Sequence, residues 1–423
     1  MMFDELDTQP DDRREAALFS RFSERLQEYA ESCKGLSRQL EGSSITTVND
    51  RASLAKLPVL RKADLMAAQQ ANPPFGDFVR ESALAGSRLF MSPGPVWEPQ
   101  VSGADPWQSA RALHAAGIRH GDRVHNAFSY HLTPGGFILD EGARSLGCVV
   151  FPAGVGNTES QVQAIRQLQP KAFIGTPDYL QVLLDHAEAE DQPLKSIERA
   201  LVSGGALFPA MRERYTAQGI HVQQCYATAD LGVIAYESHS DGNIHPGMLI
   251  NEGLIVELLT PGTDTPVKPG EVGEVVVTRL NPDYPLLRFA TGDLSAEIVE
   301  PSPCGRTQRR LRGWMGRADQ RTKVRGMFVD PLQLRDLPVV HPEIERWRLK
   351  IGRDADRDVM TLCITLKQNR LDLAVTEQAP DDWLAEVSQT LKRATNLSAA
   401  VTIVNELPND GLVIEDQRDY EQD

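Results

Sequence analysis

Between residues 105 and 206, short apolar runs alternate with amphipathic stretches of helical period. The apolar runs are VHNAFSY from Val124, CVVFPAG from Cys148, AFIGTP from Ala172 and ALVSGG from Ala200. The helical stretches between them cover residues 135–146, 159–168 and 178–189. Strands and helices that alternate in this way are joined by right-handed crossovers and build a mainly parallel sheet. The pattern therefore predicts an α/β fold in which helices flank the sheet.

The segments on either side of this region follow other patterns. Residues 14–40 place apolar side chains at helical spacing, which predicts a surface helix with one apolar stripe. From about residue 250, the runs LIVELL and EVVVTRL with a tight turn between them predict a smaller antiparallel, barrel-like part. A last unit near Asp330 combines strand-like runs with an amphipathic helix over 381–395, which predicts a small α+β domain.

The charge balance narrows the class of partner. Asp and Glu number 59 against 44 Lys and Arg, so the formal net charge is −15. We expect neither nucleic acid nor a membrane as partner, because such a surface does not attract phosphate backbones or anionic lipid. No run reaches the roughly 18 apolar residues of a membrane span, and the acidic start of the chain does not look like a targeting signal. Five cysteines without a CxxC pair fit reduced thiols, and we expect a cytoplasmic protein.

The sharpest motif is PLLRFATGDLSAEI at 285–298, which we expect to place Thr-Gly-Asp at the end of a strand. The glycine allows a sharp turn, and the carboxylate of Asp293 can accept hydrogen bonds from both hydroxyls of a ribose. Taken alone, the tripeptide favours an ordinary turn in which Asp293 caps a helix. Both interpretations are open at this point.

A cluster of cations follows in WMGRADQRTKVRGMFVDPLQL at 314–334. Arg317, Lys323 and Arg325 are crowded around two glycines there. Cations beside glycine-permitted bends can form a local phosphate site inside an otherwise acidic protein. We therefore expect the basic strip from Arg288 to Arg325 to hold one phosphate ester, and the alternative is a solvated charged face.

The order of these motifs resembles the adenylate-forming superfamily, and within it most of all the phenylacetate-coenzyme A ligase family. The resemblance runs from about residue 53 to the C-terminus. The blocks that carry it are KLPVLRKADL (56–65), ARALHAAGIRHGDRVHNAFSYHLTPGG (110–136), LGCVVFPAGVGNTESQVQAI (146–165), GTPDYL (175–180), VSGGA (202–206), YATADLG (226–232), GEVGEVVVT (270–278), RFATGDL (288–294), PCGRT (303–307) and GRADQRTKVRGMFV (316–329). Each block alone is weak, whereas the whole set in this order and spacing is specific.

The resemblance implies an organisation into two domains. The large N-terminal adenylate-binding domain would cover residues 1–318, and a small α+β lid domain would cover residues 319–423. Asp319 falls at the hinge about which the lid swings between two half-reactions. Asp230, Arg317 and Asp319 are the residues to which the resemblance gives catalytic roles.

The resemblance also implies a nucleotide site. It assigns Asp293 to the ribose, Arg317 to the nucleotide and Tyr226 to the aromatic face that stacks on adenine. The other positions assigned to this site are Ser92, Gly94, Gly204, Gly205, Ala206, Ala227, Thr228 and Lys323. For VSGGA, a plain turn from strand to helix is the alternative interpretation.

Metal and acid substrate are assigned in the same way. Asp230 takes the place of a glutamate that helps to hold Mg²⁺, and its carboxylate is a hard oxygen ligand of the kind that Mg²⁺ prefers. Tyr130, His131 and Gly136 occupy the stretch that shapes the aryl-acid pocket. His131 alone also fits a structural histidine. The cofactors implied are ATP, Mg²⁺ and coenzyme A.

The phosphate loop departs from the family pattern. The segment in register is MSPGPVWEPQ (91–100), which keeps Ser92 and Gly94 but carries three prolines. Proline has no N–H to donate to a phosphate. Glu98 stands where the family often has a lysine, and a carboxylate beside phosphates is unfavourable unless a metal intervenes.

A second departure lies near the C-terminus. Leu412 takes the place of the lysine that stabilises the charge developing in adenylation. An aliphatic side chain cannot do this, and the loss of one such contact typically costs about a hundredfold to a thousandfold in rate. Arg418 is the nearest basic residue.

A third departure concerns zinc. Some relatives carry Cys and His residues that look able to bind zinc beside the Thr-Gly-Asp region. Here only His245 and Cys304 lie near those positions, with Ser238 and Ser302 where cysteines would stand. We predict no structural zinc, because two ligands do not close a site.

The resulting hypothesis is an AMP-forming ligase, a homodimer, that activates an aryl, phenylacetate-like acid with ATP and transfers it to coenzyme A. Two alternatives stay open. One is a catalytically weakened homologue that binds AMP, an acyl-adenylate or an aryl ligand, which Leu412 and the proline-rich loop favour. The other is an adenylating enzyme that passes the acyl group to a different acceptor.

Overall fold

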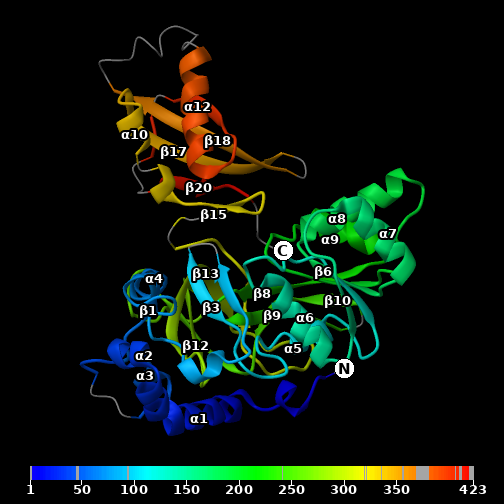
Figure 1. Ribbon diagram of the computed structural model, residues 1–423, viewed down its shortest axis with the longest axis vertical. Helices are drawn as coiled ribbons and strands as arrows, with labels where there is room; N and C mark the ends of the chain where they lie inside the picture. Colours follow the sequence, from blue (N-terminus) through cyan, green and yellow to red (C-terminus); the bar gives the residue numbers. More distant parts are fainter. Residues whose placement is uncertain are drawn as a thin grey trace. The chain divides into compact units, whose positions relative to one another are not determined.

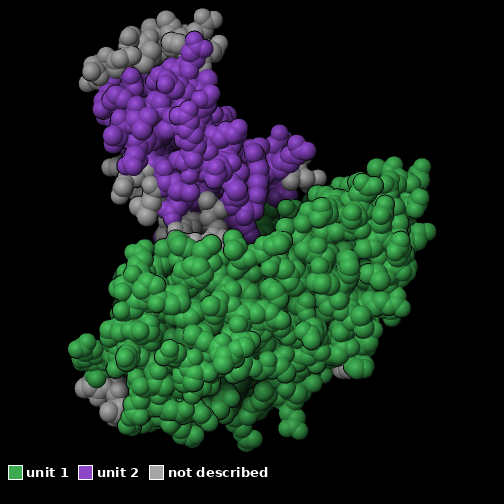
Figure 2. All heavy atoms as spheres, in the orientation of Figure 1, with its two compact units in different colours: residues 1–315, 422–423 green, residues 316–421 purple. Residues whose placement is uncertain are grey.

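The computed structural model describes residues 2–43, 47–92, 95–240, 242–318, 320, 322–334, 336–354, 357–367, 381–404, 406–408 and 412–418. The chain separates into two compact units, shown in different colours in Figure 2. The first unit comprises residues 1–315 with 422–423, and the second comprises residues 316–421. The predicted hinge at Asp319 lies outside the described residues and stays a prediction, as does the domain boundary drawn there.

The centre of the first unit is a parallel sheet with neighbouring strands in the order β5, β4, β6, β7 and β8. Their bounds are β4 Arg123–Asn126, β5 Val149–Pro152, β6 Ala172–Gly175, β7 Arg199–Val202 and β8 His221–Thr228. Four of these strands coincide with the four apolar runs from which a parallel sheet was expected. The predicted α/β class is confirmed.

Helices cover both faces of this sheet (Figure 1). They are α5 Ala110–Ala115, α6 Gly135–Ser145, α7 Thr158–Leu168, α8 Pro177–Ala189 and α9 Pro209–Ala217. Successive strand residues point to opposite faces, so Ile174 packs in a core with α5 and α6, whereas Phe173 packs in a core with α7, α8 and α9. Burial of each such large apolar side chain contributes about 1.5–3 kcal/mol. This explains why the strands read as continuous apolar runs.

Antiparallel strands continue the same sheet beyond β8, in the order β9, β10, β14, β13, β12 and β11. Their bounds are β9 Gly232–Ser240, β10 Asn243–Ile250, β11 Leu254–Leu259, β12 Val272–Arg279, β13 Leu286–Ile298 and β14 Arg310–Leu311. The short strand β1 (Leu60–Arg61) adds to β13 in parallel. The antiparallel part thus begins at Gly232, earlier than the expected residue 250.

The N-terminal segment forms two helices instead of the single one expected over 14–40. Helix α1 covers Asp11–Ser32 and α2 covers Lys34–Gln39, with Cys33 extended between them (φ −125°, ψ 98°). The N–H of Gly35 donates to the carbonyl of Asp77 at 2.9 Å, and a Cβ on Gly35 would lie 2.6 Å from the Phe78 ring. Docking of α2 against this second segment therefore accounts for the break, which helical periodicity alone does not reveal.

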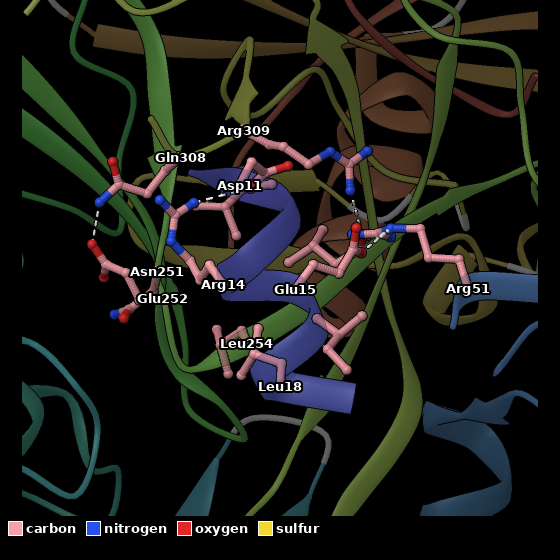
Figure 3. Close-up of a pocket in the computed structure, with 13 residues that line it drawn as sticks. Asp11, Arg14, Glu15, Leu18, Arg51, Asn251, Glu252, Leu254, Gln308 and Arg309 are labelled. Carbon is pink, nitrogen blue, oxygen red and sulfur yellow. Dashed lines mark hydrogen bonds and ion pairs between the residues drawn. The ribbon is translucent and has the colours of Figure 1, made fainter. Parts of the chain in front are cut away.

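A small polar cavity lies beside α1 and the strands that it covers (Figure 3). Arg14 bonds Asp11 at 2.9 Å, Glu15 pairs with Arg51, and Gln308 bonds Glu252. These polar side chains are paired with one another, so the cavity reflects how α1 is fixed to the sheet.

The remaining elements of the first unit are short. They are η1 Glu5–Asp7, α3 Arg51–Leu54, α4 Lys62–Ala71, η2 Glu81–Leu84, β2 Leu89–Ser92 and β3 Val96–Pro99. Strands β2 and β3 form an antiparallel hairpin. Among the described residues, no helix is both long and apolar enough to cross a membrane.

The second unit is built on a four-stranded sheet with the order β19, β18, β17 and β20. Its elements are β15 Thr322–Val324, β16 Met327–Val329, η3 Pro331–Leu334, α10 Leu337–Val340, β17 Ile344–Asp354, β18 Arg357–Leu366, α12 Asp381–Thr395, β19 Ala400–Ile403 and β20 Ile414–Asp416. Val387 and Leu391 of α12 share one hydrophobic core with Leu362 and Ile364 of β18. The expected α+β domain is confirmed, and α12 has the predicted bounds.

Candidate active site

The Thr-Gly-Asp motif forms a bulge in the middle of β13. Leu294 pairs with Glu274 and Ala290 pairs with Val276, so three residues lie opposite the single residue Val275. The expected position at the end of a strand is therefore wrong, since β13 continues on both sides of the motif. Gly292 has φ +77°, which favours glycine and allows the bulge.

Hydrogen bonds fix the bulge and the direction of Asp293. The Thr291 hydroxyl donates to the carbonyl of Val275 at 2.9 Å, and the N–H of Asp293 donates to Thr291 Oγ1 at 3.1 Å. Tyr226 Oη donates to Asp293 Oδ2 at 2.8 Å, and Trp314 Nε1 donates to Asp293 Oδ1 at 3.1 Å. A carboxylate accepts about four hydrogen bonds, so these contacts are compatible with further bonds from the hydroxyls of a ribose.

Tyr226 lies on β8 and reaches Asp293 across 67 residues of sequence. Because its hydroxyl is held by the carboxylate, the orientation of its ring is set by β13 as well as by its own strand. Ala227 and Thr228 follow on the same strand and are half-buried. The structure thus brings Tyr226 and Asp293 together, as the sequence predicts for a nucleoside site.

The VSGGA segment connects β7 to α9 as a turn. Gly204 has φ +70° and is exposed, while Gly205 and Ala206 are half-buried. Ser203 Oγ donates to the carbonyl of Cys225 at 2.8 Å, which ties this turn to β8 next to Tyr226. The turn and the tyrosine are therefore neighbours at the carboxyl ends of parallel strands, where open α/β sheets bind ligands.

Asp230 lies in the tight turn between β8 and β9. Thr228 pairs with Gly232 across this turn, and a Cβ on Gly232 would lie 2.5 Å from the carbonyl oxygen of Trp107. Gly232 has φ +81°, so both its conformation and its surroundings favour glycine. The turn buries the Asp230 side chain, whose Oδ2 lies 3.3 Å from Nζ of Lys62 at the start of α4.

The hairpin of β2 and β3 carries the segment in register with the phosphate loop. Gln69 of α4 holds it through two bonds to the backbone of Trp97, at 2.8 and 2.9 Å. Ser92 Oγ donates to Glu98 Oε1 at 3.2 Å, and both side chains are buried. Gly94 lies outside the described residues.

Glu98 and Asp230 interact in the interior of the first unit. Burial, and after it the charge of Asp230 and a hydrogen bond to it, raise the pKa of Glu98 well above its ordinary value. Lys62 and Ser92 oppose this rise. The sequence motifs do not connect Glu98 with Asp230, and they assign no role to Lys62. Only the tertiary contacts of β3, α4 and the turn after β8 unite the three.

Arg279 adds a buried cation next to this group. Its Nη1 donates to the carbonyl of Asp230 at 3.3 Å and its Nη2 to that of Pro106 at 2.6 Å. Burial lowers the pKa of Arg279 to about 10, so the guanidinium stays charged at neutral pH. The backbone of the Asp230 turn is thus held by a side chain from β12.

The stretch assigned to the acid pocket is ordered around Tyr130. Its hydroxyl donates to Asp140 Oδ2 at 2.7 Å and accepts from Asn126 Nδ2 at 2.8 Å. A Cβ on Gly136 would lie 2.8 Å from the Tyr130 ring, so glycine allows this close packing. His131 is exposed. The ring of Phe137 meets that of Tyr130 edge-on at 5.0 Å, which gives the stretch an aromatic character.

Comparisons with known proteins agree with this geometry. The family described as AMP-binding enzyme matches residues 142–281. A phenylacetate-coenzyme A ligase of Aromatoleum evansii is 30% identical over 333 residues, which cover 74% of this chain and 72% of that protein. The chain belongs to the phenylacetate-coenzyme A ligase family.

Further relatives extend this finding. A phenylacetate-coenzyme A ligase of Escherichia coli (strain K12) is 29% identical over 384 residues, which cover 84% of this chain and 82% of that protein. A crystal structure of 2-hydroxyisobutyryl-CoA ligase, in complex with 2-HIB-AMP and CoA, matches with a TM-score of 0.76 at 25% identity. The match covers 98% of this chain and 92% of the chain in that crystal structure. The resemblance predicted from the motifs is confirmed.

Two basic residues of the strip expected to bind phosphate are paired with carboxylates in this member of the phenylacetate-coenzyme A ligase family. Arg288 is fully buried, and its Nε and Nη2 bond the two carboxylate oxygens of Glu257 at 3.0 Å each. Arg309 pairs with Glu297 at 2.7 Å. The strip expected from Arg288 onward is therefore wrong at these two positions, because their charges hold the antiparallel strands together.

The two cations assigned to the nucleotide belong to the second unit. Lys323 lies on β15 and Arg317 precedes that strand, and both side chains are half-buried. Both have interactions within the protein. Their roles at the nucleotide stay predictions.

Leu412, which the resemblance predicts to replace the family's lysine, is 42% exposed next to β20, and its carbonyl accepts from Arg348 Nε at 3.2 Å. Arg418 is not a simple substitute for the missing lysine. Its Nη1 pairs with Asp358 at 2.8 Å and its Nε with Asp416 at 2.8 Å. An arginine held in this way stabilises the second unit, and it would have to leave both partners to act elsewhere.

Cys304 lies near the positions at which the resemblance led us to look for zinc ligands. Its Sγ lies 3.1 Å from Ser302 Oγ and 3.4 Å from Ser238 Oγ. Burial alone would raise the pKa of the thiol, but its hydrogen bonds with Ser238, Ser302 and Arg306 lower it. His245 instead bonds Ser240 at 2.8 Å. In the described part of the chain, no three His, Cys, Asp or Glu side chains are arranged to hold a metal ion. The prediction of no structural zinc stays a prediction.

Proposed function

We propose that the protein activates a carboxylic acid as an acyl-adenylate and transfers the acyl group to coenzyme A. The observation that carries this proposal is the carboxylate of Asp293, placed by a bulge and bonded by Tyr226 and Trp314. Membership of the phenylacetate-coenzyme A ligase family supports it. An aryl, phenylacetate-like acid is the substrate class, because the Tyr130 stretch packs aromatic rings around Gly136.

In this proposal, a carboxylate oxygen of the acid attacks the α-phosphorus of ATP and the bond to pyrophosphate breaks. A thiol then attacks the acyl carbon and AMP leaves. Asp293 holds the ribose and Tyr226 presents its ring to adenine, so the protein supplies orientation. Arg317 contacts the nucleotide, and the second unit moves about Asp319 between the two steps. The adenylate itself makes the carbonyl reactive by providing a good leaving group.

Mg²⁺ would be held by Asp230. The carboxylate fits a magnesium ion because its oxygens are hard ligands and Oδ1 is buried and, apart from the neighbouring carboxyl of Glu98, has no hydrogen-bond partner among the described residues. When bound, the ion neutralises charge on the phosphates. Lys62 holds the other oxygen, Oδ2, and so fixes the direction of the carboxylate.

A pyrophosphate-release assay tests the proposal. Wild-type protein with ATP and Mg²⁺ should release pyrophosphate only when an aryl acid is added, and coenzyme A should convert the product to a thioester detected by mass spectrometry. Asp293→Ala is the matched negative control. No acid-dependent release across a panel of aryl and aliphatic acids, together with normal AMP binding, would reject the proposal.

A second candidate function is a weakened homologue that binds AMP or an acyl-adenylate with little turnover. The observation in its favour is Leu412, an apolar residue where the family has a lysine, together with the ion pairs of Arg418. Calorimetry with AMP and a stable acyl-adenylate analogue separates the two candidates, since tight binding without pyrophosphate release supports only this one.

We also propose that the protein works in the cytoplasm as a homodimer. Light scattering coupled to size-exclusion chromatography tests the dimer directly. A monomeric mass at micromolar concentration would reject it and leave the proposed reaction untouched.

A further inference from the structure

Helix α4 begins beside the bulge that carries the carboxylate of the nucleoside side. Strand β1 leads directly into this helix and pairs in parallel with β13, so that Arg61 lies opposite Ala290, the residue before Thr-Gly-Asp. The next residue along the chain is Lys62, the first residue of α4. The same helix holds the hairpin of β2 and β3 through two hydrogen bonds. The sheet therefore fixes the start of α4 next to the bulge, and the helix joins the bulge to the hairpin in register with the phosphate loop.

The side chain of Lys62 meets the turn after β8. Its Nζ lies 3.3 Å from Asp230 Oδ2, and the side chain of Lys62 is 25% exposed whereas that of Asp230 is 2% exposed. An ammonium group has three N–H donors. Among the described residues, Asp230 is the one hydrogen-bond partner of Nζ. The ammonium can therefore bond a further acceptor on its exposed side without leaving Asp230.

The position of Lys62 within α4 is electrostatically unfavourable for a cation. The N-terminus of a helix carries a partial positive charge and stabilises anions. Asp64 in the same turn has the favourable sign, and Lys62 has the opposite one. The N-cap residue Arg61 makes no capping bond, since its side chain pairs with Asp264 and Glu274. The ammonium and the helix end thus place two positive features together, and both favour an anion.

The other charged positions of the phosphate side do not offer such a cation. Arg279 is 3% exposed, and its hydrogen bonds go to two backbone carbonyls. Glu98 and Leu412 stand where the resemblance expects lysines. Within the described part of the first unit, Lys62 combines contact with the Asp230 carboxylate and an exposed ammonium.

We propose that Nζ of Lys62 binds an oxygen of the triphosphate of ATP and supplies the positive charge that Glu98 and Leu412 do not. The proposal rests on the proposed function, in which Asp293 holds the ribose and Asp230 the metal at the phosphates. Lys62 lies next to the segments that carry both carboxylates. Because it touches the substrate, Lys62 is a catalytic residue and not only the ion-pair partner of Asp230.

Calorimetry on the full chain tests this contact with two ligands. One is α,β-methylene-ATP, which keeps a triphosphate but cannot lose pyrophosphate, and the other is adenosine, which has no phosphate. Lys62→Met should weaken binding of the analogue about 10- to 100-fold, the size of one hydrogen bond between charged groups, and leave adenosine binding unchanged. Lys62→Arg should retain binding, since it keeps a donating cation. The matched control is Lys56→Met, an exposed lysine of the same segment, which should bind as wild type does.

The same titrations in the presence of a chelator separate direct contact from an effect through the metal. A loss in Lys62→Met that persists without Mg²⁺ is expected for a bond between Lys62 and phosphate. A loss seen only with Mg²⁺ would overturn the proposal, because Lys62 would then act by holding the Asp230 carboxylate. An equal loss for adenosine, or no loss at all, would overturn it as well.

A labelling experiment on wild-type protein keeps the proposal testable should Lys62→Met not fold. Lysines are acetylated with a succinimidyl ester and the modified peptides are measured by mass spectrometry. Saturating α,β-methylene-ATP should suppress acetylation of Lys62, adenosine should not, and Lys56 should react equally in all samples. Unchanged labelling of Lys62 with the analogue bound would overturn the proposal.

The outcomes also separate this proposal from the proposed function. Analogue binding that depends on Lys62, without any acid-dependent pyrophosphate release, would reject the ligase and keep Lys62 as a phosphate ligand. Acid-dependent release at equal rates in wild type and Lys62→Met would reject the role of Lys62 and keep the ligase.

Discussion

Strand β8 and the turn after it carry both halves of the candidate site, and the two halves differ. On the nucleoside side, Tyr226 bonds Asp293 at 2.8 Å, and the residues are those that the family pattern predicts. On the phosphate side, Glu98 stands where the resemblance expects a lysine, and burial together with the neighbouring Asp230 raises the pKa of Glu98. The nucleoside side is held in place by hydrogen bonds within the sheet and keeps the residues of the family. The phosphate side differs from the family in its charges.

The largest effect is expected for Arg288, a cation that belongs to neither half. Arg288→Met leaves the buried Glu257 uncompensated, and the loss of one partner of a buried pair costs about 3–5 kcal/mol. Urea unfolding should show this loss, and AMP affinity of the folded protein should not change. Arg309→Met is the control, since its pair with Glu297 is partly exposed and removal costs about 0–1 kcal/mol. A selective loss of AMP binding in Arg288→Met would instead indicate that Arg288 belongs to the phosphate site.

The nucleoside side is tested by Asp293→Ala. The variant removes a buried acceptor for Tyr226 and Trp314 and the proposed bonds to ribose, and each hydrogen bond to a charged group is worth about 1.5–3 kcal/mol. We expect AMP affinity to fall about 100- to 1000-fold in calorimetry. Wild-type affinity in this variant would place the nucleoside elsewhere.

The weakness of the charged side is tested by Leu412→Lys. A lysine at this position should raise the rate of pyrophosphate release by about 100- to 1000-fold, the size of one charge-stabilising contact in a transition state. Leu412→Met has a similar length without the charge and should leave the rate unchanged. An unchanged rate in the lysine variant as well would mean that the phosphate side limits turnover for another reason.

A smaller effect is expected for Tyr226→Phe. The ring that we propose to face adenine is kept, and only the bonds to Asp293 and Thr291 are lost. The lost bond to Asp293 lies within the protein and not between protein and nucleotide, so AMP affinity should fall only about 3- to 10-fold. A loss as large as that of Asp293→Ala would show that the hydroxyl, and not the carboxylate, organises the nucleoside side.

The fold was predictable where a segment repeats with one period. The parallel strands β4 to β7 and helix α12 follow from apolar runs and amphipathic spacing within short windows. The break at Cys33 and the bulge at Gly292 were not predictable in this way, because each depends on a segment far away in the sequence. The hairpin β2–β3 was also missed, since the prolines in MSPGPVWEP indicate a loop, although Pro99 lies at the end of β3 opposite Leu89.

The candidate site was likewise predictable only in part. The family motifs located Tyr226 and Asp293 but not the hydrogen bond between them. The motifs included Lys62 within KLPVLRKADL, and nothing in the sequence connects it with Asp230, which is 168 residues away. Buried ion pairs have no periodicity, so they become visible only when tertiary structure brings their members together.

The bulge in β13 also sets the register of the sheet. Residues on either side of Gly292 pair with β12, so a deletion of one bulge residue would shift the pairing of Leu294–Ile298 by one position. A shift of one residue turns every side chain of a strand to the opposite face. Random deletions should therefore be tolerated least at this point, and the history of the family should contain substitutions here far more often than changes in length.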